Sequence, residues 1–241
     1  MTNTKTKEQG RHTRRPASQI PILTPLEVDE ICKRADHIRD ACMISLLYMS
    51  GRRISEVLPL RKRDFNYSQP GFDLEKSDGI ISFTCMNEKS FRQTKDSTFN
   101  IKKRGVFHEK RVHKTDPPGK EYYVRYYQKI EPKVSTLGPS GKALWWWIRR
   151  HLDNSHYDDY LFRPYGTHTD KPISRSQAYS ILVRLEPRIW LHSLRHMNFT
   201  RLAEVYADDP REMHALTFHR QFENTLIYIQ RKETKEKLKQ L

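Results

Sequence analysis

Three residues near the end of this sequence could take part in acid, base or nucleophilic chemistry. His192 and Arg195 are three positions apart, so on a helix their side chains project from one face. The spacing predicts that a group able to carry a proton near neutral pH and a permanent cation point at the same spot. Tyr228 adds a phenol, which can act as a nucleophile or be a half-buried structural side chain.

Two helices are predicted to position these residues. Apolar residues recur with a helical period along the first helix, at Leu191, Leu194, Leu202 and Val205. The second helix has an apolar stripe made of Phe222, Leu226 and Ile229. Tyr228 lies roughly a third of a turn from that stripe, at about 100° per residue. We therefore expect the Tyr228 phenol to face a ligand and not to be buried.

Two further helices are predicted near the start of the chain. The first begins with the capping box Thr24-Pro25-Leu26-Glu27 and runs to about Ala35. The second ends at Gly51 and has an apolar stripe formed by Ile38, Cys42, Leu46 and Met49. Arg53 then reaches the surface directly after a buried helix. Glu56 follows one turn later, where it could hold the Arg53 guanidinium by a charge-assisted hydrogen bond.

The middle of the chain has the pattern of strands, and the part after it is helical. Three β-rich runs predict a small antiparallel sheet, at residues 79–85, 97–102 and 122–127. One later helix begins at Ser140 and contains three consecutive tryptophans, which favour core packing with at least one ring partly exposed. Another is capped by Ser174 and ended by Pro187. The predicted fold class is α+β, mainly α, with a three-stranded antiparallel sheet.

The composition indicates a polyanionic partner. The 241 residues carry a formal net charge of +15, which favours nucleic acid first and an anionic membrane surface second. No apolar run approaches the roughly 18 residues of a membrane span, and no secretory signal opens the sequence. The three cysteines lack any C-x-x-C pair, so buried thiols in a reducing compartment are expected. These features predict a soluble intracellular protein.

Two sequence boxes resemble the tyrosine recombinases, the phage-integrase family. His192-x-x-Arg195, then His219, then Tyr228 nine residues later, is similar to the C-terminal signature of that family. Upstream, GRRISEVLPL from Gly51 resembles the segment that holds the first catalytic arginine, which matches Arg53 and makes Glu56 its supporting carboxylate.

The chain departs from the family pattern at two positions. Phe218 stands where the family usually has glycine before the histidine, and Arg52 replaces a usual apolar residue. On spacing alone, Arg52 and Arg53 would be interpreted as a solvated basic pair. Because positioning dominates this type of catalysis, a bulky Phe218 is expected to shift His219.

The resemblance implies that the chain cleaves and rejoins DNA without a metal or other cofactor. Tyr228 would attack phosphorus and form a 3′-phosphotyrosyl intermediate. Arg53 and Arg195 would hold the phosphoryl oxygens. His192 would take the tyrosine proton or orient the phosphate as a general acid or base, and His219 would hydrogen-bond a non-bridging oxygen.

The resemblance also implies a lysine that protonates the leaving 5′-oxygen. Lys102 and Lys103 best match the family's position in the turn between the second and third strands, and Lys89 and Lys114 are weaker candidates. For each, non-specific phosphate contact or simple solvation is the alternative. Further contacts to DNA are expected from the basic loop, at Lys102, Lys103, Arg104, Lys110, Arg111 and Lys114.

The predicted organisation is a flexible basic arm over residues 1–20 and one catalytic domain over residues 21–241, without the separate N-terminal core-binding domain of typical members. The expected partners are double-stranded DNA and three further copies in a tetramer on that DNA, with no membrane. The expected location is the cytoplasm, on DNA, in a prokaryotic or viral element.

Other functions compete with this interpretation. A type IB topoisomerase uses the same tyrosine chemistry and would relax supercoiled DNA without a defined site. A non-catalytic DNA-binding protein could retain a decayed recombinase scaffold. The sequence gives little support to a metal-dependent nuclease, because no carboxylate cluster or His/Cys ligand spacing stands out.

Overall fold

The computed structural model describes residues 21–93, 107–110, 122–166, 170–219 and 222–230. The predicted basic arm lies outside the described residues, as do Lys102, Lys103, Arg104, Arg111 and Lys114. No helix among the described residues is long and apolar enough to cross a membrane.

Helix α1 (Pro25–Lys33) begins at the predicted capping box. The Thr24 backbone N–H donates to the Glu27 carboxylate at 2.7 Å, and the Glu27 N–H donates to Thr24 Oγ1 at 3.3 Å. Helix α2 (Ile38–Ser50) follows and packs against α1, α4 and α6, so it is buried along almost its whole length. Its burial places the short helix α3 (Ile54–Val57), and with it Arg53, at a fixed corner of the core.

Gly51 makes the turn between α2 and α3 possible. Its backbone is left-handed, with φ 61°, a conformation that favours glycine. A Cβ at this position would lie 2.5 Å from Asn198 Oδ1 and 2.9 Å from the Phe199 ring. The absence of a side chain therefore allows α6 to lie directly against the end of α2.

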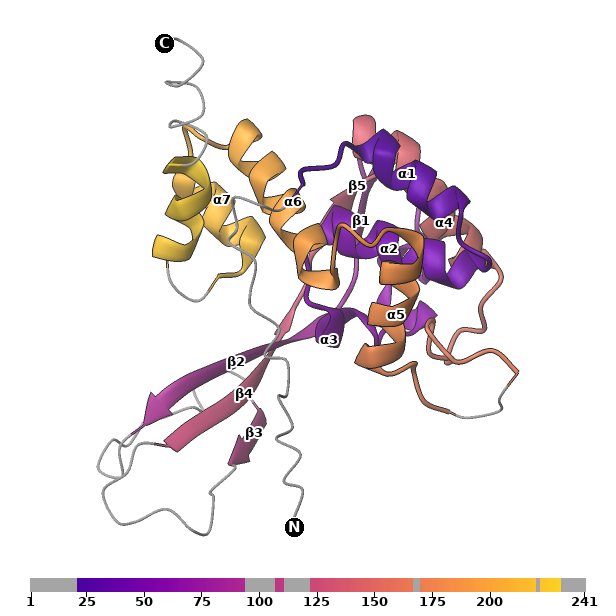
Figure 1. The fold of residues 1–241 in the computed structure, drawn as a ribbon, viewed down its shortest axis with the longest axis horizontal. Coiled ribbons are helices and arrows are strands. Elements are labelled where there is room, and N and C mark those ends of the chain that lie inside the picture. The colour runs from indigo at the N-terminus through magenta and orange to yellow at the C-terminus, as the bar shows by residue number, and fades with distance from the viewer. Residues whose placement is uncertain (1–20, 94–106, 111–121, 167–169, 220–221, 231–241) are drawn as a thin grey trace, which may run out of the picture.

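Two small antiparallel sheets are present among the described residues. β1 (Ile80–Ser82) pairs with β5 (Lys133–Ser135). In the second sheet, β4 (Tyr122–Ile130) lies between β2 (Cys85–Gln93) and β3 (Phe107–Lys110). Figure 1 shows this three-stranded sheet extending away from the helical body.

The sheet type was predicted correctly, but the strand limits were not. The predicted run 79–85 is divided between β1 and the start of β2, and β3 lies in the segment predicted as a loop. The predicted strand 97–102 lies outside the described residues. Pairing of β2 with β4 over nine residues determines these limits, and local composition does not reveal such pairing.

The second half of the chain is helical, as predicted. Ser174 caps its helix by accepting from the Gln177 N–H at 3.2 Å. Trp145 is buried, Trp146 is exposed, and Trp147 donates to Asp29 at 2.7 Å. The elements not yet given are the 3₁₀ turns η2 (Lys62–Asp64) and η3 (Asn66–Ser68) and the helices α4 (Pro139–Asp153), α5 (Arg175–Leu185), α6 (Leu191–Val205), α7 (Pro210–Thr217) and residues 223–230.

The core has two parts. The larger one surrounds α2 and includes the three cysteines, all of them buried thiols as expected. A smaller cluster joins α6, α7 and the last described helix, and consists of Phe199, Ala203, Met213, Tyr228 and Ile229. The candidate site lies where these two parts meet, because α6 contributes Leu194 and Met197 to the larger part and Phe199 and Ala203 to the smaller one.

Candidate active site

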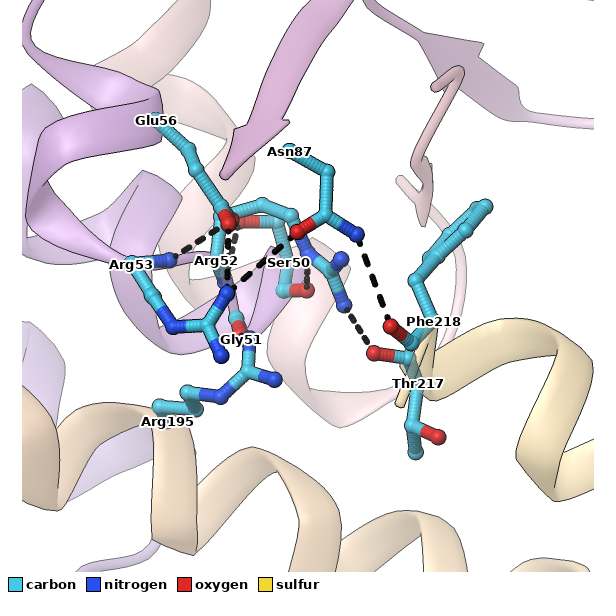
Figure 2. A network of polar contacts seen from close by, with 9 residues as sticks. All are labelled: Ser50, Gly51, Arg52, Arg53, Glu56, Asn87, Arg195, Thr217 and Phe218. Atoms are coloured by element: carbon cyan, nitrogen blue, oxygen red, sulfur yellow. Dashed lines mark hydrogen bonds and ion pairs between the residues drawn. The ribbon is translucent and has the colours of Figure 1, made fainter. Parts of the chain in front are cut away.

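Arg53 is held at the start of α3 by a buried carboxylate. Its guanidinium donates to Glu56 Oε1 at 3.0 Å and to Asn87 Oδ1 at 3.3 Å, and its backbone N–H donates to Glu56 Oε2 at 3.0 Å. Glu56 is 1% exposed, whereas 45% of the Arg53 side chain is exposed. The expected hydrogen bond between Glu56 and Arg53 is present, and it orients a cation that solvent can reach (Figure 2).

Arg195 approaches the same place from α6. It is 5% exposed, donates to the Gly51 carbonyl oxygen, and lies over the Phe199 ring at 4.3 Å. Figure 2 shows its guanidinium next to that of Arg53. Burial, and then the charges of Arg52 and Arg53, lower the pKa of Arg195, although an arginine stays protonated at neutral pH. Concentrated positive charge of this kind favours binding of an anion.

Arg52 is not part of a solvated pair, because its side chain is buried. It donates to the Ser50 carbonyl oxygen at 3.2 Å and to the Thr217 carbonyl oxygen at 2.9 Å. Its guanidinium carbon lies 4.8 Å from the centre of the Phe218 ring. Arg52 and Phe218, the two departures from the family pattern, therefore contact each other and connect the α2–α3 corner to the end of α7 (Figure 2).

His219 lies directly after that connection. Its Nδ1 is 3.0 Å from Thr225 Oγ1. Its ring stacks on that of Tyr228, with ring centres 6.1 Å apart and an angle of 15° between the ring planes. Burial, followed by the charges of Arg195 and Arg52, lowers the pKa of His219 to about 3. Without a bound anion, the imidazole is therefore neutral.

Tyr228 is buried, contrary to the prediction that it faces a ligand. Its side chain is 8% exposed and packs edge-on against Phe199, with ring centres 5.4 Å apart. Thr225, one turn earlier, is also buried, and its hydroxyl is within hydrogen-bond distance of His214, Thr217 and His219. Because these contacts satisfy the Thr225 hydroxyl, a polar residue can lie inside the cluster. The buried face of this helix therefore includes Thr225 and Tyr228, and it differs from the face that the predicted apolar stripe indicated.

His196 is a residue of this site that sequence reasoning missed. Its Nδ1 lies 2.6 Å from the Tyr228 hydroxyl, and its ring is edge-on to that of His192 at 4.6 Å. His192 and His196 are four positions apart on α6, a spacing that places both rings on one face. That spacing was the available signal.

His192 lies at the outer edge of the site and is exposed. Partial loss of hydration, followed by the proximity of His196 and Arg195, lowers its pKa to about 4. His192 is thus neutral in the unliganded chain. A bound phosphate would offset the surrounding positive charge and raise the pKa of this imidazole.

The predicted residues therefore converge, apart from the lysines. Phe199 lies between Arg195 and the Tyr228 ring, and His192 joins the group through His196. Lys110 belongs to β3 and Lys89 to β2, on the sheet that extends from the helical body. No group of three or more potential ligands that could hold a metal ion occurs within the described ranges.

This chain is similar to known site-specific recombinases. The tyrosine recombinase XerA of Pyrococcus horikoshii is 28% identical over 144 residues, which are 60% of this chain and 44% of XerA. The XerH site-specific recombinase, solved in a pre-cleavage complex with its difH substrate, matches with a TM-score of 0.52 and 13% identity over 87% of this chain and 50% of that one. No family model matches.

The helical body with a small antiparallel sheet is the fold of a tyrosine recombinase. The XerA match adds a link in sequence. The two matches together support a tyrosine recombinase family assignment, at low identity and partial coverage. The chain spans no more than half the length of either relative.

Proposed function

We propose that the chain is the catalytic part of a site-specific DNA recombinase that cuts and rejoins strands through Tyr228. The main support is the meeting of Arg53 and Arg195, from two distant boxes, beside the cluster that contains the Tyr228 phenol. Two guanidinium groups can bind the non-bridging oxygens of one phosphodiester and neutralise the charge that develops in the transition state.

The proposed reaction conserves the energy of the broken bond. Tyr228 Oη attacks phosphorus, the bond to the 5′-oxygen breaks, and a 3′-phosphotyrosyl link remains until a 5′-hydroxyl attacks it in turn. His219 and His192 hydrogen-bond the phosphate. A lysine protonates the leaving oxygen, and Lys102 and Lys103 are the first candidates. Lys114 is a further candidate, because it lies in the sequence between β3 and β4, which pair with each other.

The proposed substrate is double-stranded DNA, and the proposed assembly is a tetramer on DNA. A charge of +15 and a projecting sheet that contains Lys89 and Lys110 support binding to a polyanion. Further basic residues, including Arg104, Arg111 and Lys114, would contact phosphates. A cytoplasmic location on DNA and a prokaryotic or viral mobile element are part of the same proposal.

The test uses a library of labelled duplexes with a randomised central segment, incubated with the full chain in EDTA. We expect a DNA adduct that protease removes, formed by the unmodified chain and not by Tyr228→Phe, with equal DNA binding by both. An adduct with Tyr228→Phe would mean that another residue attacks. Binding without any adduct would favour a non-catalytic DNA-binding protein, which the buried Tyr228 also fits. Relaxation of supercoiled DNA without site preference would indicate a type IB topoisomerase.

A further inference from the structure

We infer that His196 is the general base that takes the proton of the Tyr228 hydroxyl when that oxygen attacks phosphorus. The inference rests on the proposed function, because it requires Tyr228 to be the nucleophile. His196 Nδ1 lies 2.6 Å from Tyr228 Oη, within the range in which a general base contacts the proton it removes.

The proton balance of the step follows from this contact. As the Oη–P bond forms, the phenolic proton moves to Nδ1 of a neutral His196, and the imidazole becomes a cation. The P–O5′ bond breaks, and the 5′-oxygen receives its proton from the separate general acid. In the resealing reaction, the 5′-hydroxyl attacks phosphorus and loses its proton to that acid's conjugate base. His196 then returns its proton to the departing phenolate.

The surroundings of His196 and His192 indicate different roles for these two histidines. His192 is edge-on to His196 at 4.6 Å and lies at the exposed edge, on the helical face that also holds Arg195. His192 is therefore available to the phosphate, while His196 faces the phenol. His219 stacks on the Tyr228 ring and has its Nδ1 at Thr225, so this nitrogen is not directed at the phenolic proton.

The contact alone would also suit a side chain that only positions the phenol, and two substitutions separate the roles. His196→Asn retains a polar atom near the position of Nδ1 but has no basicity, whereas His196→Ala removes both. A positioning role predicts that the asparagine variant keeps most of the activity. A base predicts that both variants lose a similar factor, about 10²–10⁴ in rate.

The experiment measures single-turnover adduct formation on a duplex recovered from adducts of the unmodified chain. The duplex is synthesised in two forms, with either oxygen or sulfur as the bridging 5′ atom at the cut site. A thiolate leaves without needing a proton, so the sulfur substrate restores variants that lack the general acid and not those that lack the base. We expect both His196 variants to be slow on both substrates, with DNA binding and unfolding midpoints close to those of the unmodified chain. His156→Asn, a change at an exposed histidine between α4 and α5, is the matched control and should react at the normal rate.

The outcomes separate this inference from the proposed function. Adducts formed at the normal rate by His196→Asn, or rescue of either variant by the sulfur substrate, would overturn the assignment of His196 while leaving Tyr228 as nucleophile. Faster reaction of His196→Ala would show that the contact restrains the phenol and would also overturn it. Absence of an adduct from the unmodified chain would contradict the proposed function, and the base assignment with it.

Discussion

At the scale of single residues, the site contains more cations than anions, because several arginines lie near the single buried carboxylate of Glu56. Arg52 and Arg195 are both buried, and Arg53 is paired with Glu56. Partial loss of hydration, followed by the same positive charge, lowers the pKa of both His192 and His219 and keeps these imidazoles neutral. This excess of positive charge favours binding of an anion, and it affects how the stability of the chain depends on pH.

His219 should make the folded chain less stable in acid. Its folded pKa of about 3 lies below the value of roughly 6.5 for an unfolded histidine. The unfolded state then binds a proton that the folded state does not, so stability present above about pH 6.5 is lost as the pH falls toward 3. We expect His219→Asn to show a shallower fall in unfolding free energy between pH 7 and pH 5 in urea titrations. The difference should stay below about 1.4 kcal/mol per pH unit, since the ring is only partly buried. Equal slopes for both chains would contradict the shift.

Arg52 and Phe218 should be energetically coupled. Phe218 has a left-handed backbone, φ 53°, which is strained for a bulky residue, and Arg52 both covers its ring and donates to the neighbouring carbonyl of Thr217. We expect Arg52→Leu to destabilise the chain by about 1–3 kcal/mol, because a buried carbonyl loses its donor. Arg52→Leu should cost less when Phe218→Gly is already present, since glycine relieves the backbone strain.

A double-mutant cycle by urea unfolding measures this coupling. An interaction free energy between about 0.5 and 3 kcal/mol is expected for residues in contact. If the two single changes add to within about 0.3 kcal/mol, Arg52 and Phe218 act independently.

At the scale of elements, the site depends on how closely α6 lies against the end of α2. Asn198 donates to the carbonyl oxygens of Tyr48 and Met49 at 3.0 and 2.8 Å, and Arg195 donates to that of Gly51. These bonds satisfy the last carbonyl groups of α2 from another helix instead of from water. The position of Arg195 relative to Arg53 is consequently set by the α2–α6 contact.

Gly51→Ala should disrupt this contact. The left-handed backbone costs a non-glycine residue about 1–2 kcal/mol, and the added Cβ would lie 2.5 Å from Asn198 Oδ1. Gly71→Ala is a matched control, since Gly71 has φ 77° and nothing lies within 4 Å of a Cβ there. We expect Gly51→Ala to be less stable than the control by about 1–3 kcal/mol in urea. Equal losses of stability in the two variants would mean that α6 moves away from the added Cβ without a cost in free energy.

At the scale of the whole molecule, charge and shape point to a long anionic partner. The helical body carries the site, and the three-stranded sheet projects from it (Figure 1). A net charge of +15 is far more than one phosphate requires, so further contacts along a nucleic acid backbone are expected.

Binding to duplex DNA should therefore depend steeply on salt. Six to ten phosphate contacts would lower the affinity by about 10³–10⁵ between 50 and 200 mM salt. Fluorescence anisotropy with a labelled duplex measures this slope, and Tyr228→Phe should give the same slope because it removes no charge. A nearly flat dependence would argue against a backbone-binding surface.

The sequence by itself determined the features that depend on neighbouring residues. Caps at Thr24 and Ser174, the turn at Gly51 and the support of Arg53 by Glu56 all involve residues within one helical turn, so spacing predicts them. The mainly helical fold class is confirmed, and the similarity to XerA and XerH supports the family that the two boxes indicated. Catalytic roles for these residues stay predictions.

Only the tertiary structure decided which groups meet. The bond from His196 to Tyr228 spans 32 positions, and that from Arg52 to Thr217 spans 165. Thr225 can be buried because the ring nitrogens of His214 and His219 lie within hydrogen-bond distance of its hydroxyl, which offsets the cost of burying a polar group. The buried face of the last helix therefore includes Tyr228. Helical periodicity records which residues are apolar, whereas the contacts of a buried polar residue depend on how distant segments pack.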